Sequence, residues 1–134
     1  MIKIYRKSSG DVSSRKAKIW MQEHSIPYEM YSMDDLSLAE LKHILRLSNG
    51  VEEIMLSTKR AWKTYQELVE PFCGWEVTFN EMVHYLLRNT ELLRQPLIFD
   101  EQRLLVGYNE EEIRKFLPRL TRKMAYRNAA QELL

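Results

Sequence analysis

The stretch LLRQPLIFDEQRLLVGYNEEEIRKFLP, residues 92–118, decides the fold that we predict for this chain. Its apolar runs at Leu97–Phe99 and Leu104–Val106 are typical of two short strands. Asp100–Gln102 between them favours a tight turn. A helix is expected to begin at Asn109, because acidic residues follow it at the positive end of the helix dipole. The stretch therefore predicts an antiparallel hairpin that leads into a helix.

The beginning of the chain predicts a strand, a helix and a second strand. Ile2–Tyr5 is rich in residues that favour strands, and the helix is expected between Ser13 and His24. Helical spacing gives this helix one buried face, which consists of Ala17, Trp20, Met21 and His24. Tyr28–Met33 is expected to be the second strand. Strands joined in this way run parallel with a right-handed crossover.

A block of helices is predicted between the two halves of the sheet. Ser37 and Glu40 form a capping box, and an apolar helix face follows, made of Leu38, Leu41, Ile44 and Leu45. Asn49-Gly50 is expected to end this helix, because both residues tolerate positive φ.

Two more helices are expected before the hairpin. One starts near Ser57 and turns Ala61, Trp62 and Tyr65 inward. The other follows a second capping box, Thr78–Glu81, and carries an apolar stripe made of Phe79, Met82, Val83, Leu86 and Leu87.

The order βαβ, then helices, then ββα is that of a thioredoxin-like fold. We therefore predict an α/β protein with a mixed four-stranded sheet and a helical insertion. A length of 134 residues indicates one domain, 1–134. Its parts are a sheet core at 1–35 and 92–118, the insertion at 36–91 and a basic tail at 119–134.

The composition is that of an ordinary soluble globule, with 45% hydrophobic and 29% charged residues. No apolar run approaches the ~20 residues of a membrane span, and the N-terminus has no signal-peptide core. We expect a cytoplasmic protein without membrane contact.

Cysteine and histidine usage argues against a metal site, and we expect no cofactor. Cys73 is the only cysteine, which excludes an internal disulfide and a thiol cluster. His24, His43 and His84 lie far apart in the sequence. Cys73 is interpreted as a structural or incidental thiol.

The net charge of +1 gives no overall attraction to nucleic acid. The charge is unevenly distributed, however: residues 114–127 contain six basic and no acidic residues. Such a run can contact nucleic acid, but a solvated helix face is the more common explanation.

Several blocks of sequence resemble the Spx regulators of the Spx/arsenate-reductase-like family. The strongest is GYNEEEIRKFLPR, residues 107–119, and Arg15-Lys16-Ala17 with Trp20 and 24–27 matches the first helix. KHILR at 42–46 and residues 53–58 match the middle of the Spx sequences. The resemblance covers nearly the whole chain and is weakest at 59–90.

The resemblance implies a thioredoxin-like core with a helical domain and no catalysis. It implies that the chain binds the C-terminal domain of the RNA polymerase α subunit and modulates stress-response transcription. Gly50 and Arg46 match positions at that interface. Gly50 also fits the simpler interpretation of a helix C-cap, and the two roles are compatible.

The chain departs from this family at the start of the first helix, where the resemblance implies a CxxC motif. Asp11 and Ser14 occupy the two cysteine positions. The disulfide switch is therefore absent, and arsenate reduction is excluded by that route, because the nucleophilic thiol is missing. We expect no catalytic residue, and interpret Ser13 and Ser14 as helix caps.

A degenerate redox or anion site is expected where Asp11 and Ser14 meet Arg94 and Pro96. The resemblance implies an arginine immediately before the proline, but Gln95 stands there. Arg94, one position earlier, and the helix N-terminus could retain weak anion binding. A cis Gln95–Pro96 bond fits a thioredoxin-like fold.

Promoter DNA is expected as a partner only within the polymerase complex, since a few cations bind DNA weakly in salt. The candidate contacts are Lys59, Arg60, Arg119, Arg122 and Lys123. The resemblance also implies a ClpXP-type protease, and whether the ending 131–134 is its tag stays open. The alternatives are an arsenate-reductase-like oxidoreductase or anion-binding protein, and a silent antagonist of the same polymerase site.

Overall fold

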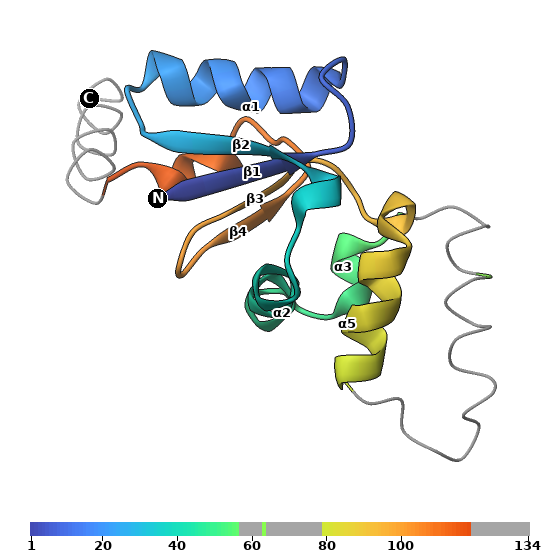
Figure 1. Cartoon of the computed structure of the whole chain (residues 1–134). Coiled ribbons are helices and arrows are strands. Elements are labelled where there is room, and N and C mark those ends of the chain that lie inside the picture. Colours follow the sequence, from blue (N-terminus) through green and yellow to red (C-terminus); the bar gives the residue numbers. More distant parts are fainter. Residues whose placement is uncertain (57–62, 64–78, 119–134) are drawn as a thin grey trace.

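The computed structural model describes residues 1–56, 63 and 79–118, and a mixed four-stranded sheet lies at its centre (Figure 1). The strands are β1 (Ile2–Arg6), β2 (Tyr28–Ser32), β3 (Leu97–Phe99) and β4 (Leu104–Val106), in the order β2-β1-β3-β4. β1 pairs parallel with β2 and antiparallel with β3, and β3 pairs antiparallel with β4. The predicted sheet and hairpin are thereby confirmed.

Side chains alternate between the two faces of the sheet, as strand geometry requires. Ile4 and Ile98 point into a cluster beneath α1 (Val12–Glu23) and the 3-10 helix η4 (Glu112–Phe116). Tyr5 lies in the second cluster, on the opposite face. The sheet therefore separates two apolar cores, and each contains strand residues that alternate in sequence.

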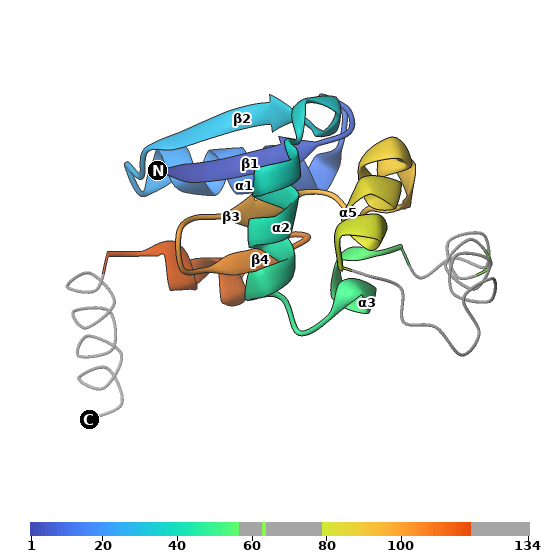
Figure 2. The same cartoon turned by 60° about the horizontal axis from the view of Figure 1, so that its bottom comes forward.

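The second core lies between the sheet and three helices, α2 (Leu38–Leu47), α3 (Val51–Ile54) and α5 (Phe79–Arg88). Two short 3-10 turns flank them, η1 (Met33–Asp35) and η3 (Thr90–Leu92). Figure 2 shows α2 on the sheet face opposite α1. The helical insertion thus covers the face that α1 leaves open.

The capping box at the start of α2 forms as expected. Ser37 Oγ accepts from the Glu40 backbone N–H at 3.1 Å, and Glu40 Oε1 accepts from the Ser37 backbone N–H. Of the expected apolar face, Leu41, Ile44 and Leu45 are buried and Leu38 is half-buried.

Several predicted boundaries and positions are wrong. His24 is exposed: its ring stacks on Trp20 at 4.3 Å and Nδ1 donates to the Trp20 carbonyl. β2 ends at Ser32, since Met33 begins η1 with its side chain buried. Both residues lie where a helix or strand ends, and there local hydrogen bonds override the periodicity.

The helix expected from Asn109 is a short 3-10 helix. Its N-cap is Glu111, and Asn109 stabilises the turn before it, because Oδ1 accepts from the backbone N–H groups of Glu111 and Glu112. Leu117 then takes an extended conformation, with ψ of 141°. A residue before proline is disfavoured in the α region, and Pro118 follows. The helical segment therefore ends at Phe116.

The helical insertion contains one helix that the sequence did not predict, α3, and other predicted parts of it lie outside the described residues. α3 was not predicted, because four residues are too few for a periodic signal. The helix expected from Ser57, with Ala61, Trp62 and Tyr65, lies outside the described residues, as do Thr78 and Cys73. In α5, Val83 and Leu86 are buried as expected.

Within the described part of the chain, no helix has the length and apolar character needed to cross a membrane.

Candidate functional site

The N-terminus of α1 is closed by a bond between the two residues at the expected cysteine positions. Asp11 Oδ2 accepts from the Ser14 backbone N–H at 2.8 Å and from Ser14 Oγ at 2.5 Å. Asp11 is therefore the cap, and the expectation that Ser13 or Ser14 caps the helix is wrong. Asp11 lies two residues before Ser13, and its carboxylate accepts both hydrogen bonds through Oδ2.

Ser14 is fully buried, so its hydroxyl depends on Asp11 for a partner. The Asp11 carboxylate also places a negative charge at the positive end of α1. A bound anion at this helix end would meet that charge. The Asp11 carboxylate therefore disfavours anion binding at the helix end where the family resemblance implies a pair of thiols.

Arg94, Gln95 and Pro96 connect η3 to β3. The Gln95–Pro96 bond is cis, as expected. Gln95 Oε1 accepts from the Lys7 backbone N–H at 2.7 Å, which ties the segment to the end of β1. The Arg94 backbone N–H donates to the Ile54 carbonyl at 2.8 Å, and its guanidinium reaches the Glu53 carbonyl at 3.5 Å.

A polar pocket of about 640 Å³ opens beside Arg94. It brings Arg94 together with Ser13, but Asp11, Ser14 and Pro96 do not line it. Its remaining lining residues come from the α2–α3 region, the segment before β3 and the stretch from β4 to η4: Asn49, Glu53, Gln95, Leu104, Leu105, Val106, Gly107, Tyr108, Asn109, Glu112 and Lys115.

Sequence reasoning missed most of this lining. Asn49 and Glu112 are 63 positions apart in number, and no spacing motif connects them. Only the fold brings the α2–α3 connection beside η4.

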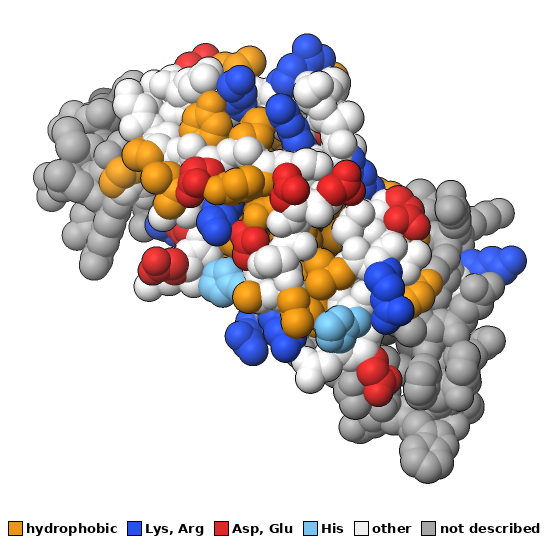
Figure 3. Space-filling view, viewed as in Figure 1, with side chains coloured by type: hydrophobic (Ala, Val, Ile, Leu, Met, Phe, Trp, Pro, Cys, Tyr) orange, Lys and Arg blue, Asp and Glu red, His pale blue; other side chains and the backbone are white. Residues whose placement is uncertain are grey.

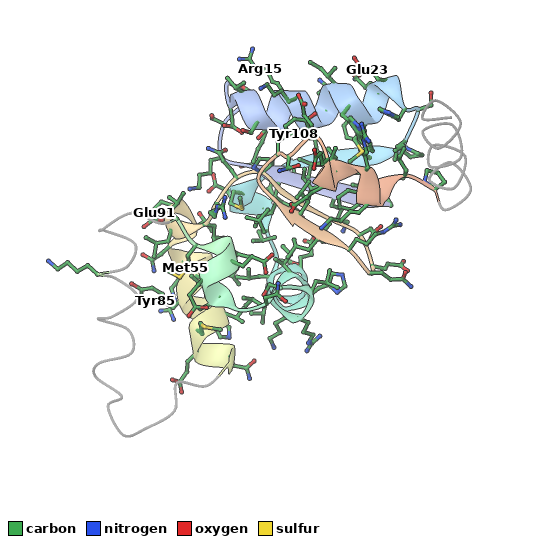
Figure 4. All side chains as sticks on the ribbon, turned by 180° about the vertical axis from the view of Figure 1, so that it is seen from behind. Arg15, Glu23, Met55, Tyr85, Glu91 and Tyr108 are labelled. Carbon is green, nitrogen blue, oxygen red and sulfur yellow. The ribbon has the colours of Figure 1, made fainter. Side chains whose placement is uncertain are left out.

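Tyr108 lies on the α1 side of the sheet (Figure 4), where burial and then the nearby carboxylates of Glu110 and Glu23 raise its pKa.

No group of three histidine, cysteine, aspartate or glutamate side chains among the described residues could hold a metal ion.

The second predicted site lies where α2 gives way to α3. Arg46 is exposed in the last turn of α2. Ser48 is the C-cap of α2, and Gly50, at φ 145°, is the N-cap of α3. The interpretation of Gly50 as the C-cap of α2 is therefore wrong, although its positive φ was expected. A Cβ at this position would meet Glu52 Oε2 at 2.9 Å.

The expected DNA contacts lie outside the described residues: Lys59, Arg60, Arg119, Arg122 and Lys123. On the face visible in Figure 3, basic and acidic side chains are interspersed over the described surface.

The family model described as the ArsC family matches residues 6–116 of the chain. The chain belongs to the ArsC family. Within this family it is similar to the global transcriptional regulator Spx of Listeria innocua, at 40% identity over 131 residues, with 96% of each chain covered. It is 36% identical to the global transcriptional regulator Spx 1 of Oceanobacillus iheyensis, again with 96% of both chains covered. These relatives make the chain an Spx homologue within the ArsC family.

Two solved structures share the fold of this chain. An ArsC family related protein from Bacteroides fragilis superposes with a TM-score of 0.64 at 25% identity, covering 85% of this chain and 95% of its own. A Staphylococcus aureus protein determined by NMR in solution gives a TM-score of 0.68 at 16% identity, with 88% and 100% covered. The predicted α/β, thioredoxin-like architecture of this ArsC family chain is confirmed.

Proposed function

We propose that this chain is an Spx-type transcription regulator that binds the C-terminal domain of the RNA polymerase α subunit without a thiol switch. It acts in the cytoplasm as a binding protein rather than an enzyme, and modulates stress-response transcription. Its curated relatives are named transcriptional regulators, and the similarity covers 96% of the chain.

The observation that carries the proposal is the exposed connection between α2 and α3. Arg46 projects from the last turn of α2 with no partner among the described residues. Gly50, four positions later, offers backbone without a side chain, which allows a partner to approach closely. The exposed Arg46 cation suits an acidic group on a protein partner, while the Glu52 carboxylate, which lies where a Gly50 Cβ would be, suits a basic one.

The bond between Asp11 and Ser14 explains why this binding should not depend on redox conditions. The two positions hold oxygen atoms that are joined by a hydrogen bond, and no disulfide can form between them. We therefore expect the same affinity for the α domain in oxidising and reducing buffer. Spx-type regulation then operates here through binding alone.

Calorimetry with the purified α C-terminal domain tests the proposal directly. Arg46→Glu should weaken binding about tenfold or more, since reversing an interface charge replaces an attraction with a repulsion. Arg15→Glu is the matched control, because Arg15 projects from the outer side of α1 (Figure 4). The control should bind within about twofold of wild type. A wild type that does not bind would overturn the proposal.

Gly50 needs two variants, because any side chain is strained at its φ of 145°. Gly50→Ala introduces the backbone strain and the close contact with Glu52, while Gly50→Arg has both and adds a large charged group. Binding lost in the arginine variant and retained in the alanine variant supports a direct contact. If both variants bind equally weakly, the change at the backbone of Gly50 accounts for the loss of affinity and a direct contact does not.

In vitro transcription from a stress promoter distinguishes an activator from an antagonist of the same polymerase site. The free protein should give no mobility shift with promoter DNA at physiological salt, because contact is proposed only beside polymerase.

An arsenate-reductase-like activity is the alternative function, and the site geometry disfavours it. Of the two expected cysteine positions, one holds the Asp11 carboxylate, which would repel an arsenate oxyanion, and the other holds the buried Ser14 hydroxyl, which donates to that carboxylate. Measurable arsenate turnover with glutathione or thioredoxin would reverse this conclusion.

A further inference from the structure

Glu40 connects α2 to the central strand of the sheet through both of its carboxylate oxygens. Oε1 accepts from Ser37 Oγ at 2.9 Å within the capping box. Oε2 accepts from the Tyr5 hydroxyl at 2.5 Å and from Lys3 Nζ at 3.1 Å. The Glu40 side chain thus takes part in the cap of α2 and also attaches this helix to β1.

The Tyr5 hydroxyl is held at a fixed position. Its side chain is 2% exposed, and its ring stacks between Tyr31 at 5.2 Å and Phe99 at 5.8 Å. A buried hydroxyl without a partner is costly, so Tyr5 and Glu40 constrain one another. The pair therefore defines one place on the sheet for the first turn of α2.

A second contact holds α2 one turn later. His43 Nε2 donates to the Asp100 carbonyl at 2.8 Å, and the ring packs against Phe99 at 6.0 Å. Asp100 lies in the β3–β4 turn, directly after Phe99, which pairs with Lys3. The Glu40 and His43 contacts therefore hold the first half of α2 at one end of the sheet. Arg46 follows His43 by three positions, one helical turn further along.

Apolar contacts alone would leave the pose of α2 less defined. Leu41, Ile44 and Leu45 pack it on the core, but the hydrophobic effect has no preferred direction. Hydrogen bonds have a narrow range of lengths and angles. The directional contacts of Glu40 and His43 therefore fix the rotation and the axial position of the helix.

We propose that Glu40 is a positioning residue for partner binding: bonded to Tyr5 and Lys3, it sets the pose of α2 and hence where Arg46 and Gly50 meet the partner. This inference rests on the proposed function and deepens it. Residues on β1, far from the binding surface in sequence and not part of it, would then control affinity.

Tyr5→Phe tests this inference, because it removes one hydroxyl and keeps the stacked ring. Tyr31→Phe is a matched control: the Tyr31 hydroxyl donates to Glu29 at 2.5 Å, but Glu29 is exposed and lies on β2, so the bond holds no helix. Calorimetry with the α domain should show about fivefold weaker binding for Tyr5→Phe and less than about twofold for Tyr31→Phe. Equal affinities would overturn the inference.

A double-mutant cycle separates positioning from a general loss of stability. If Tyr5→Phe misplaces α2, then Arg46→Ala should cost less affinity in the Tyr5→Phe background than in wild type. Additive effects would show that the two residues act independently and would overturn the positioning role.

Amide hydrogen exchange of the free protein provides a readout that does not need the partner. Tyr5→Phe should accelerate exchange in α2 (Leu38–Leu47) more than in α1 (Val12–Glu23). Equal acceleration in both helices would contradict the inference. A wild type that fails to bind the α domain would remove the proposed function, while this comparison would still decide whether the Tyr5–Glu40 bond fixes α2.

Discussion

Ser14 Oγ donates to Asp11 Oδ2 at 2.5 Å, inside the first turn of α1. Since Ser14 is fully buried, the hydroxyl has no access to water, and the carboxylate satisfies both it and the Ser14 backbone N–H. The two positions where the family resemblance implies a pair of thiols thus hold a structural contact. The start of α1 has become a stabilising element of the fold.

Asp11→Ala should lower the free energy of unfolding by about 1–3 kcal/mol. The change removes the helix cap and leaves the buried Ser14 hydroxyl without an acceptor. Urea unfolding followed by circular dichroism measures it. Ser13→Ala is the control, since Ser13 is half-buried and its hydroxyl makes no hydrogen bond in the described structure. Equal losses in the two variants would refute the capping role of Asp11.

Ile98→Ala should cost about 2–5 kcal/mol of stability, because a fully buried side chain at the centre of the sheet leaves a cavity. Ile19→Ala makes the same chemical change on α1, where the side chain is 50% exposed. We expect that variant to stay within about 0.5 kcal/mol of wild type. Denaturant titrations of both proteins provide the comparison.

Glu40 should make stability depend on pH in the acidic range. Burial alone would raise its pKa, but hydrogen bonds from Tyr5, Ser37 and Lys3 outweigh burial and hold the pKa below its usual value of 4.5. The unfolded state therefore takes up a proton first as the pH falls. The contribution of Glu40 is present above pH 4.5 and is lost as the pH falls through the folded pKa.

Urea midpoints measured between pH 7 and pH 3 test this dependence. In Glu40→Gln the acidic decline should be shallower than in wild type, because the titrating group is gone. Identical slopes in the two proteins would show that other carboxylates account for the decline.

Arg103→Lys should lower stability by about 1–2 kcal/mol, because arginine uses several nitrogen atoms here. Nε and Nη2 each lie 3.0 Å from Asp100 Oδ2, and Nη1 donates to the Lys115 carbonyl of η4. A lysine can replace one of these contacts at most. Arg15→Lys, on the exposed side of α1, should be neutral, and thermal unfolding of both variants is the measurement.

The sequence predicted those parts of the fold that depend on short-range patterns. The turn at Asp100, the capping box of Ser37 and Glu40, and the hairpin strands each carry their signal within a few residues. The 3-10 form of η4 was missed because five residues are too few to distinguish it from an α-helix by periodicity. The α3 turn was missed because it is held by packing: Val51 and Ile54 are both buried.

The candidate site was less accessible to sequence reasoning. The Asp11–Ser14 contact could have been foreseen, since an aspartate three residues before a backbone N–H is a common cap. The Tyr5–Glu40 bond joins residues 35 positions apart, and the lining of the polar pocket comes from four separate segments. Such contacts depend on the tertiary arrangement and leave no local pattern in the sequence.

The strand order has a consequence for how these molecules meet one another in concentrated solution. Within the described residues β2 and β4 form the two edges of the sheet, with five and three residues. Short edge strands offer few free backbone groups to a neighbouring chain, and Glu29 adds a charge to the β2 edge. Burying such an edge against a second copy would also bury that carboxylate. The three-residue β4 edge and the Glu29 charge on β2 therefore disfavour edge-to-edge pairing of two chains.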